Sequence, residues 1–177
     1  MVTGASRGIG RALATELAKS GCRLLLTALE EDELAALANE LQSKFAFPVE
    51  TVACDLPDLE SRKNLINWIL NRKEPPDILI NNAGLGYFGR FEGSDWNRIE
   101  KTIALNISAL IHLTYEFIPI LKKHPSAKNV NMSSGMARLP YPGLAVYGAT
   151  KGFVSSFSES LSSELKREIK NGHILIL

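Results

Sequence analysis

The sequence has little cysteine, almost no net charge and no long uninterrupted apolar run. Cys22 and Cys54 are its only cysteines in 177 residues, too few for the disulfide framework of a small secreted domain. Lys plus Arg number 20 and Asp plus Glu 19, which leaves a formal net charge of +1. Nucleic acid and anionic membrane surfaces are usually bound by clustered positive charge. We therefore expect neither kind of partner.

The most apolar long stretch, residues 103–121, is interrupted by polar side chains and by Pro119. A membrane-spanning helix needs about 20 mostly apolar residues with few charges. Residues 1–20 are broken by Gly, Arg, Thr and Glu and contain no signal-peptide apolar core. Together with two cysteines that we expect to be reduced thiols, these features predict a soluble, cytoplasmic protein.

Short β-rich runs alternate with longer helical patterns along the whole chain, without repeats or a linker. The expected strands cover residues 2–3, 23–28, 49–53, 77–81, 128–132 and 174–177. The helical patterns between them cover residues 9–20, 34–41, 59–70, 96–121 and 145–170. This alternation predicts an α/β fold with a parallel sheet and helices on both faces. Right-handed crossovers make it a doubly wound sheet, which we expect to form one domain over residues 1–177.

A glycine-rich segment, Thr3-Gly4-Ala5-Ser6-Arg7-Gly8-Ile9-Gly10, lies where the first strand turns into the first helix. Glycines at such a turn let a pyrophosphate approach backbone N–H groups at the positive end of the helix. The alternative is an ordinary glycine-rich turn, since a glycine pattern alone is weak. Its position between strand and helix favours a cofactor site.

Two further segments follow the carboxyl ends of strands, where ligands of open α/β sheets bind. Asn81-Asn82-Ala83-Gly84 follows the fourth strand and Asp55-Leu56 the third. Asp55 also fits a helix N-cap or a turn residue.

Tyr147 and Lys151 stand four residues apart and so share one face of the last helical pattern. The pair alone is weak support for a site. Ser133-Ser134 closes the strand before it, and Asn106 lies on the preceding helix. Each has a structural alternative, because Asn106 also fits a buried polar position and Ser134 a turn cap.

Taken together, these residues resemble the short-chain dehydrogenase/reductase family. The pattern TGxxxGxG at residues 3–10, NNAG at residues 81–84, Ser134 placed 13 residues before Tyr147, and YxxxK ending at Lys151 occur in the family's order. The resemblance covers the whole chain, and the glycine spacing is that of the shorter, single-domain branch.

The resemblance implies a Rossmann-like domain that interconverts a carbonyl and an alcohol by hydride transfer with NAD(P). Tyr147 would be the general acid/base, Lys151 would lower its pKa and bind the nicotinamide ribose, Ser134 would hold the substrate oxygen, and Asn106 would position a water. No metal ligands are implied. The implied cofactor-binding residues are Gly4, Ser6, Arg7, Gly8, Ile9, Gly10, Asp55, Leu56, Asn82, Ala83, Gly84, Tyr147 and Lys151.

The choice of cofactor depends on a few side chains near the second strand. Arg7 precedes the second glycine of the motif, as in relatives that use NADP, and a guanidinium suits phosphate. However, Leu29 stands where such relatives often carry arginine, and Ala28 where NAD users carry an acid. Glu30 lies at a distance at which an acid can serve NAD, but it also fits a charged helix N-terminus. We expect NADP, with NAD as the alternative.

The chain is shorter than the family domain, which usually exceeds 200 residues, and stops inside the sixth strand. The substrate lid and the last strand of the family are therefore expected to be missing, either because the protein is trimmed or because it is a shortened relative. The alternative to an oxidoreductase is a nucleotide-binding module without turnover. Leu139, Tyr141, Pro142 and Leu144 fit either one wall of a substrate pocket or loop packing.

Family members commonly assemble through the two helices that carry Asn106 and Tyr147. Both helical patterns carry an apolar stripe, and further apolar residues widen the apolar face of the first helix beyond a single stripe, which fits an interface. We expect a homodimer or homotetramer, although the same residues also fit an intramolecular core. The stripes comprise Ile107, Ile111, Tyr115 and Ile118, and Phe153, Phe157, Leu161 and Leu165.

Overall fold

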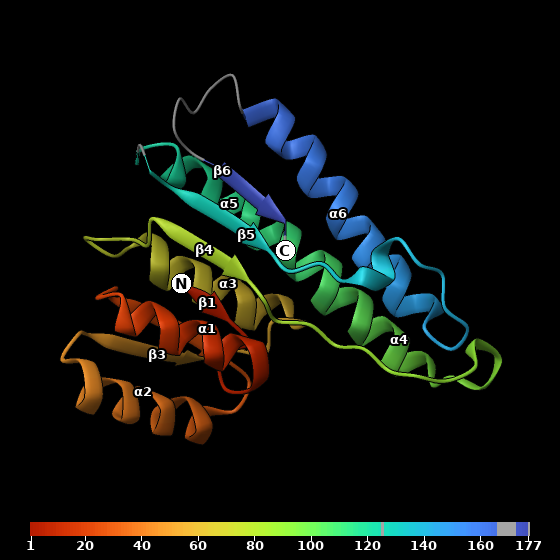
Figure 1. Ribbon diagram of the computed structural model, residues 1–177, viewed down its shortest axis with the longest axis horizontal. Coiled ribbons are helices and arrows are strands. Elements are labelled where there is room, and N and C mark those ends of the chain that lie inside the picture. Colours follow the sequence, from red (N-terminus) through yellow and green to blue (C-terminus); the bar gives the residue numbers. More distant parts are fainter. Residues whose placement is uncertain (125, 166–172, 177) are drawn as a thin grey trace.

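Six parallel strands form the sheet of this protein, seen in a computed structural model that describes residues 1–124, 126–165 and 173–176. The spatial order is β3-β2-β1-β4-β5-β6, and every neighbouring pair is parallel (Figure 1). This order confirms the predicted doubly wound fold. The strands are β1 Val2–Thr3, β2 Leu24–Ala28, β3 Val49–Ala53, β4 Ile78–Asn81, β5 Lys128–Asn131 and β6 His173–Ile176.

Helices connect successive strands, close to the predicted ranges. The predicted helix over residues 96–121 is continuous, but its middle is π-helical. The predicted helix over residues 145–170 is described as far as Leu165, and residues 166–170 and 177 lie outside the described part of the chain. The helices are α1 Gly8–Lys19, α2 Glu31–Phe45, α3 Leu59–Leu70, α4 Trp96–Ile103, the π-helical η2 Ala104–Ala109, α5 Leu110–Leu121 and α6 Ala145–Leu165, with short 3₁₀ turns η1 Phe91–Gly93 and η3 Gly135–Ala137.

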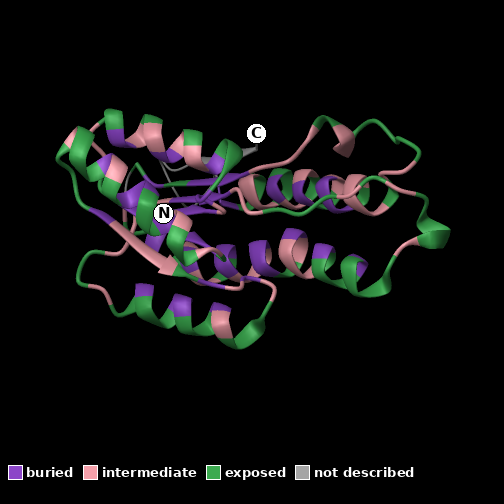
Figure 2. Ribbon diagram, turned by 90° about the horizontal axis from the view of Figure 1, so that it is seen from below, coloured by how far each residue is buried: buried purple, intermediate pink, exposed green. Residues whose placement is uncertain are grey.

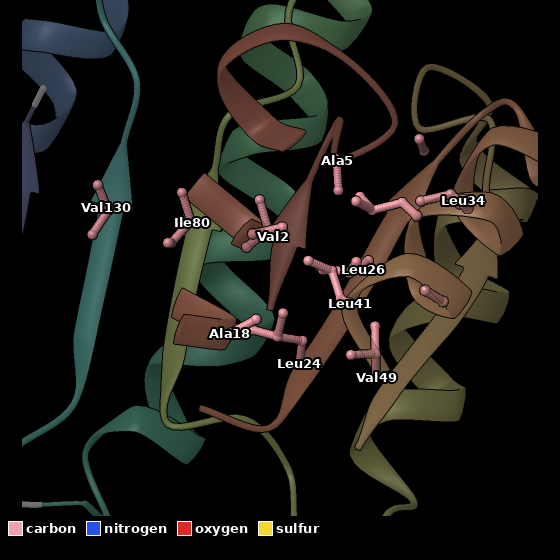
Figure 3. Close-up of a cluster of buried hydrophobic side chains, with 14 residues drawn as sticks. Val2, Ala5, Ala18, Leu24, Leu26, Leu34, Leu41, Val49, Ile80 and Val130 are labelled. Atoms are coloured by element: carbon pink, nitrogen blue, oxygen red, sulfur yellow. The ribbon is translucent and has the colours of Figure 1, made fainter. Parts of the chain in front are cut away.

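Two apolar clusters hold the helices on opposite faces of the sheet. Side chains alternate between the faces of a strand, so Leu24 and Leu26 of β2 enter one cluster and Leu25 the other. The first cluster packs α1 and α2 against the sheet, with Leu34 and Leu41 from α2 (Figure 3). The second takes residues from α3 and α5. In Figure 2 the buried residues accordingly lie in the strands and on the helix sides that face them.

Hydrogen bonds between buried amides and hydroxyls attach α6 and α5 to the sheet. Asn81 Nδ2 donates to Asn131 Oδ1 at 2.9 Å and to Thr114 Oγ1 at 3.2 Å, and Asn131 Nδ2 donates to Ser158 Oγ of α6 at 2.8 Å. A buried polar group loses its stabilising effect when its partner moves. This part of the core therefore fixes the position of α6 more narrowly than apolar packing alone.

The helix that runs from Trp96 to Leu121 is apolar enough, by length and composition, to cross a membrane. Its 26 residues include a window with a mean hydropathy of 1.4, of which 33% is buried. The polar residues within this stretch lower its mean hydropathy only slightly. In the fold its α5 part is a core helix, since Leu113, Phe117 and Leu121 pack in the second cluster.

Among the residues whose burial the structure describes, Phe117 is the largest fully buried side chain, and its replacement tests the second cluster. Phe117→Ala should lower the free energy of unfolding by about 3–5 kcal/mol, because it removes buried apolar surface and leaves a cavity. Phe91→Ala is the control, since Phe91 is 61% exposed and its loss should change stability by no more than about 0.5 kcal/mol. Urea unfolding measures both, and equal small losses would contradict the described packing.

Candidate active site

The glycine-rich loop between β1 and α1 has backbone conformations and close contacts that disfavour any residue other than glycine. Gly4 and Gly8 have φ of +63° and +52°, in the left-handed region that favours glycine. A Cβ on Gly10 would lie 2.1 Å from the carbonyl oxygen of Gly4. The N-cap residue of α1, Arg7, makes no capping hydrogen bond with its side chain, so the first N–H groups of the helix can bind an anion.

Thr3 and Asn82 join this loop to the end of β4. Thr3 Oγ1 accepts hydrogen bonds from the backbone N–H groups of Asn82 at 3.0 Å and Ala83 at 2.9 Å. Asn82 Nδ2 donates in return to the carbonyl oxygens of Thr3 at 2.9 Å and Gly4 at 3.2 Å. Thr3 was not among the predicted site residues. Its signal in the sequence was the first letter of the TGxxxGxG pattern.

Asn106 lies in the π-helical segment η2 and is buried. Its Oδ1 accepts from the N–H of Leu85 at 2.8 Å, while its Nδ2 donates to the Leu85 carbonyl at 2.8 Å and to Thr150 Oγ1 at 2.9 Å. The side chain thereby connects the loop after NNAG to α6. The buried polar position considered in the sequence is confirmed, and Thr150 is a contact that the sequence did not indicate.

Tyr147 and Lys151 lie one turn apart on α6, as their spacing predicts, with Lys151 Nζ 5.9 Å from the centroid of the tyrosine ring. Lys151 is buried, and its Nζ donates to the carbonyl oxygen of Met132 at 2.7 Å. Burial lowers the pKa of the Lys151 ammonium below its ordinary value. A Cβ on Gly84 would lie 3.5 Å from Lys151 Nζ and 3.4 Å from Asn106 Oδ1, so both polar groups face the end of NNAG.

The two serines that follow β5 have different contacts. Ser134 Oγ accepts from the N–H of Met136 at 3.2 Å, which is the turn cap considered as its alternative. Ser133 Oγ donates to the carbonyl oxygen of Lys151 at 3.0 Å and lies 2.7 Å from Ser155 Oγ. Ser133 therefore holds the turn of α6 that carries Lys151, a role that the sequence analysis missed.

One cleft of about 430 Å³ connects the glycine-rich loop with Tyr147 and Lys151. Its lining comes from the segments that follow β1, β4 and β5 and from the start of α6; Figure 1 shows these segments at the carboxyl ends of the strands. Asp55 and Leu56 are outside its lining, and Leu56 is buried in the second cluster. The lining also leaves out Ser6, Gly10, Asn106 and Ser134. Lining residues are Gly4, Arg7, Gly8, Ile9, Asn82, Ala83, Gly84, Leu85, Gly86, Met132, Ser133, Tyr147 and Lys151.

At the outer end of this cleft Arg7 is paired with two carboxylates. Its guanidinium lies 3.1 Å from Glu30 and 2.7 Å from Glu33, and these contacts raise the pKa of the arginine. Glu30 is the N-cap residue of α2 but caps no N–H with its side chain. Its carboxylate instead accepts from Ser6 Oγ at 3.2 Å.

A second pocket of about 550 Å³ contains the four residues considered as a substrate wall. Leu139, Tyr141, Pro142 and Leu144 line it together with small residues of α6 such as Gly148. Tyr147 is not part of this lining. These apolar side chains therefore gather next to the cleft of Tyr147 but in a separate hollow.

Comparison with known proteins gives a consistent result. The family model for short chain dehydrogenases matches residues 1–174. A very-long-chain 3-oxoacyl-CoA reductase of Mus musculus is 34% identical over 171 residues, which cover 94% of this chain and 54% of that protein. The chain thus spans about half the length of the curated relatives of this kind that it matches.

Solved structures agree in fold. A short-chain dehydrogenase from Sphingobium yanoikuyae in complex with NADPH superposes with a TM-score of 0.89 at 34% identity, covering 94% of this chain and 65% of that one. A metagenomic short-chain oxidoreductase in complex with NADP has a TM-score of 0.91 at 30% identity, covering 99% and 78%.

Gly10 tests the close approach within the glycine-rich loop. Gly10→Ala should lower the free energy of unfolding by about 1–3 kcal/mol, because the new Cβ overlaps the Gly4 carbonyl. Helix propensity alone favours alanine by about 1 kcal/mol. The sign of the change in unfolding free energy therefore shows whether the steric overlap or the helix propensity dominates. Gly89→Ala, whose Cβ would meet no atom within 4 Å, is the control in the same urea titration. A stabilised Gly10→Ala variant would contradict the geometry.

Proposed function

Because this chain belongs to the short-chain dehydrogenase family, we propose that it interconverts a carbonyl and an alcohol with a nicotinamide dinucleotide. The observation that carries the proposal is the single cleft lined by the glycine-rich loop at one end and by Tyr147 and Lys151 at the other. A dinucleotide is long enough to need both ends. The substrate and the activity of the whole protein are part of the proposal.

The residues of the cleft suit a dinucleotide. The close approach of Gly10 to the Gly4 carbonyl keeps the glycine-rich loop tight, and the start of α1, where Arg7 makes no side-chain cap, presents N–H groups to a pyrophosphate. Lys151 and Tyr147 lie where the nicotinamide half would be held. Asp55 and Leu56 stay predictions as cofactor-binding residues, since they lie outside the lining.

When bound, the dinucleotide supplies or accepts a hydride. The proton of the alcohol is then exchanged with Tyr147 Oη as general acid or base. The Lys151 ammonium, one turn away on α6, would stabilise negative charge on that oxygen during the proton transfer. The hydrogen bond from Lys151 Nζ to Met132 O favours the charged lysine and opposes the effect of burial.

Ser134 and Asn106 complete the proposed set. Ser134 would bind the substrate oxygen, for which its Oγ must also serve as a donor besides accepting from Met136 N–H. Asn106 would act mainly by holding Leu85 and Thr150 in place, and the water that it would position is implied by the family resemblance only.

We favour NADP(H) over NAD(H) as the cofactor. Arg7 lines the cleft, and the Sphingobium and metagenomic structures contain NADPH and NADP. NAD(H) stays the alternative, because the position after β2 carries the exposed Leu29 rather than an arginine.

We also propose a homodimer or homotetramer formed by the helices of Asn106 and Tyr147, in a cytoplasmic protein. Tyr115 is 72% exposed and Phe153 37% exposed. Phe153 and Phe157 stack at 5.9 Å. Leu165, in contrast, is buried within the chain. Both cysteines are free thiols, which suits a reducing compartment.

Tyr147→Phe tests the proposed chemistry. The variant should lose at least about 100-fold in turnover, a typical contribution of general acid–base catalysis, and keep its affinity for NADPH, since only the hydroxyl is removed. Lys151→Ala should lose both. The measurement is NADPH fluorescence titration followed by oxidation at 340 nm over a panel of carbonyl compounds. Binding without turnover by the unaltered chain would instead favour a nucleotide-binding module.

Sedimentation velocity at micromolar concentration tests the assembly. We expect a species larger than a monomer, and Tyr115→Arg should dissociate it, because a charge would be buried in the interface. Trp68→Arg, at an exposed aromatic residue of α3, is the control and should leave the assembly intact. A monomeric unaltered chain would refute the proposal.

A further inference from the structure

We propose that Glu33 is a specificity-determining residue that competes with the 2′-phosphate of NADP(H) for Arg7. The inference rests on the proposed function and concerns how that site chooses between two dinucleotides. It starts from the ion pairs at the outer end of the cleft. Glu33 lies in the first turn of α2, outside the glycine-rich loop itself.

Arg7 is the only described side chain that both lines the cleft and carries a positive charge at the end opposite Lys151. Its Nε donates to Glu33 Oε2 at 2.7 Å, and its Nη2 lies 3.1 Å from Glu30 Oε1. Two carboxylates thus already occupy the guanidinium that a 2′-phosphate would use. A phosphate that pairs with the Nε–Nη2 edge must replace at least one of them, and a phosphate that uses Nη1 still meets the charge of both.

The exchange is physically accessible because all three side chains are partly exposed. The side-chain exposure is 64% for Arg7, 41% for Glu33 and 39% for Glu30. Exposed ion pairs contribute little to stability, whereas a guanidinium and a phosphate form a strong, bidentate pair. NAD(H) has a ribose hydroxyl at this position and requires no such exchange. The carboxylates therefore penalise NADP(H) alone.

Glu33 and Glu30 differ in what else they hold. Glu30 also accepts from Ser6 Oγ in the loop, so its replacement would disturb the loop and affect both dinucleotides. The contacts described for Glu33 are with Arg7 only. Glu33 is thus the position at which the competition for Arg7 can be changed without altering the loop.

The test compares the Kd of NADPH and NADH by fluorescence titration of the 177-residue chain and its Glu33→Gln variant. Glu33→Gln should tighten NADPH about three- to tenfold, the range expected for one exposed ion pair and a nearby like charge. NADH should change by less than about twofold, since its ribose hydroxyl carries no charge. The ratio of the two dissociation constants is the readout.

Glu31→Gln is the matched control. Glu31 is exposed in the same first turn of α2, and within the described ranges it forms no ion pair with Arg7. Its replacement makes the same change in net charge and should leave the ratio unchanged. Equal gains from Glu31→Gln and Glu33→Gln would overturn the inference in favour of a general effect of charge.

A double-mutant cycle with Arg7→Gln tests whether the effect of Glu33 on NADPH binding acts through Arg7. Arg7→Gln should weaken NADPH more than NADH and should abolish the gain from Glu33→Gln. A gain that persists without Arg7, or an unchanged ratio in Glu33→Gln, would overturn the inference while both dinucleotides still bind. If the unaltered chain bound neither dinucleotide, the proposed function would fail together with the inference.

Discussion

Hydrogen bonds between Thr3 and Asn82 hold together the ends of β1 and β4, and the cleft depends on them. The Thr3 hydroxyl accepts from two backbone N–H groups of the NNAG segment, and the Asn82 amide returns donors to the carbonyls of Thr3 and Gly4. The loop can come this close because Gly10 has no Cβ to meet the Gly4 carbonyl. The hydrogen bonds between Thr3 and Asn82 therefore require glycine at position 10, since an added Cβ would push the Gly4 carbonyl and the two strand ends apart.

The half of the cleft that contains Tyr147 and Lys151 is fixed by hydrogen bonds on α6. Asn131 bonds Ser158, Ser133 bonds the carbonyl of Lys151, and Asn106 bonds Thr150. These contacts come from two separate parts of the chain, the end of β5 with the residues directly after it and η2, and they fall along one helix. A helix held only by apolar packing tolerates small shifts, whereas several short directional bonds do not. Tyr147 and Lys151 thus take their positions from the sheet and from η2 rather than from their own helix alone.

The two ends of the cleft differ in how their positive charges are balanced. Lys151 is buried, and the described chain offers it a backbone carbonyl rather than a carboxylate. Arg7 is exposed and paired with Glu30 and Glu33. A charge that lacks a counterion can act directly on a reacting group beside it. A charge that is already paired binds a ligand only in competition with its carboxylates. This contrast suits a site where one end takes part in chemistry and the other selects a partner.

The amino-acid sequence by itself determined the alternation of strands and helices, the doubly wound sheet, and the placing of Tyr147 and Lys151 on one helix face. These features depend on local periodicity and on spacings of a few residues. The bonds from Thr3 to Asn82, 79 residues away, and from Asn106 to Thr150 could not be predicted, because they arise only when parallel strands bring distant segments together. The pairing of Arg7 with Glu33 belongs to the same class. The sequence indicated no ion-pair partner for Arg7. Only the packing of α2 beside the loop places two carboxylates next to its guanidinium.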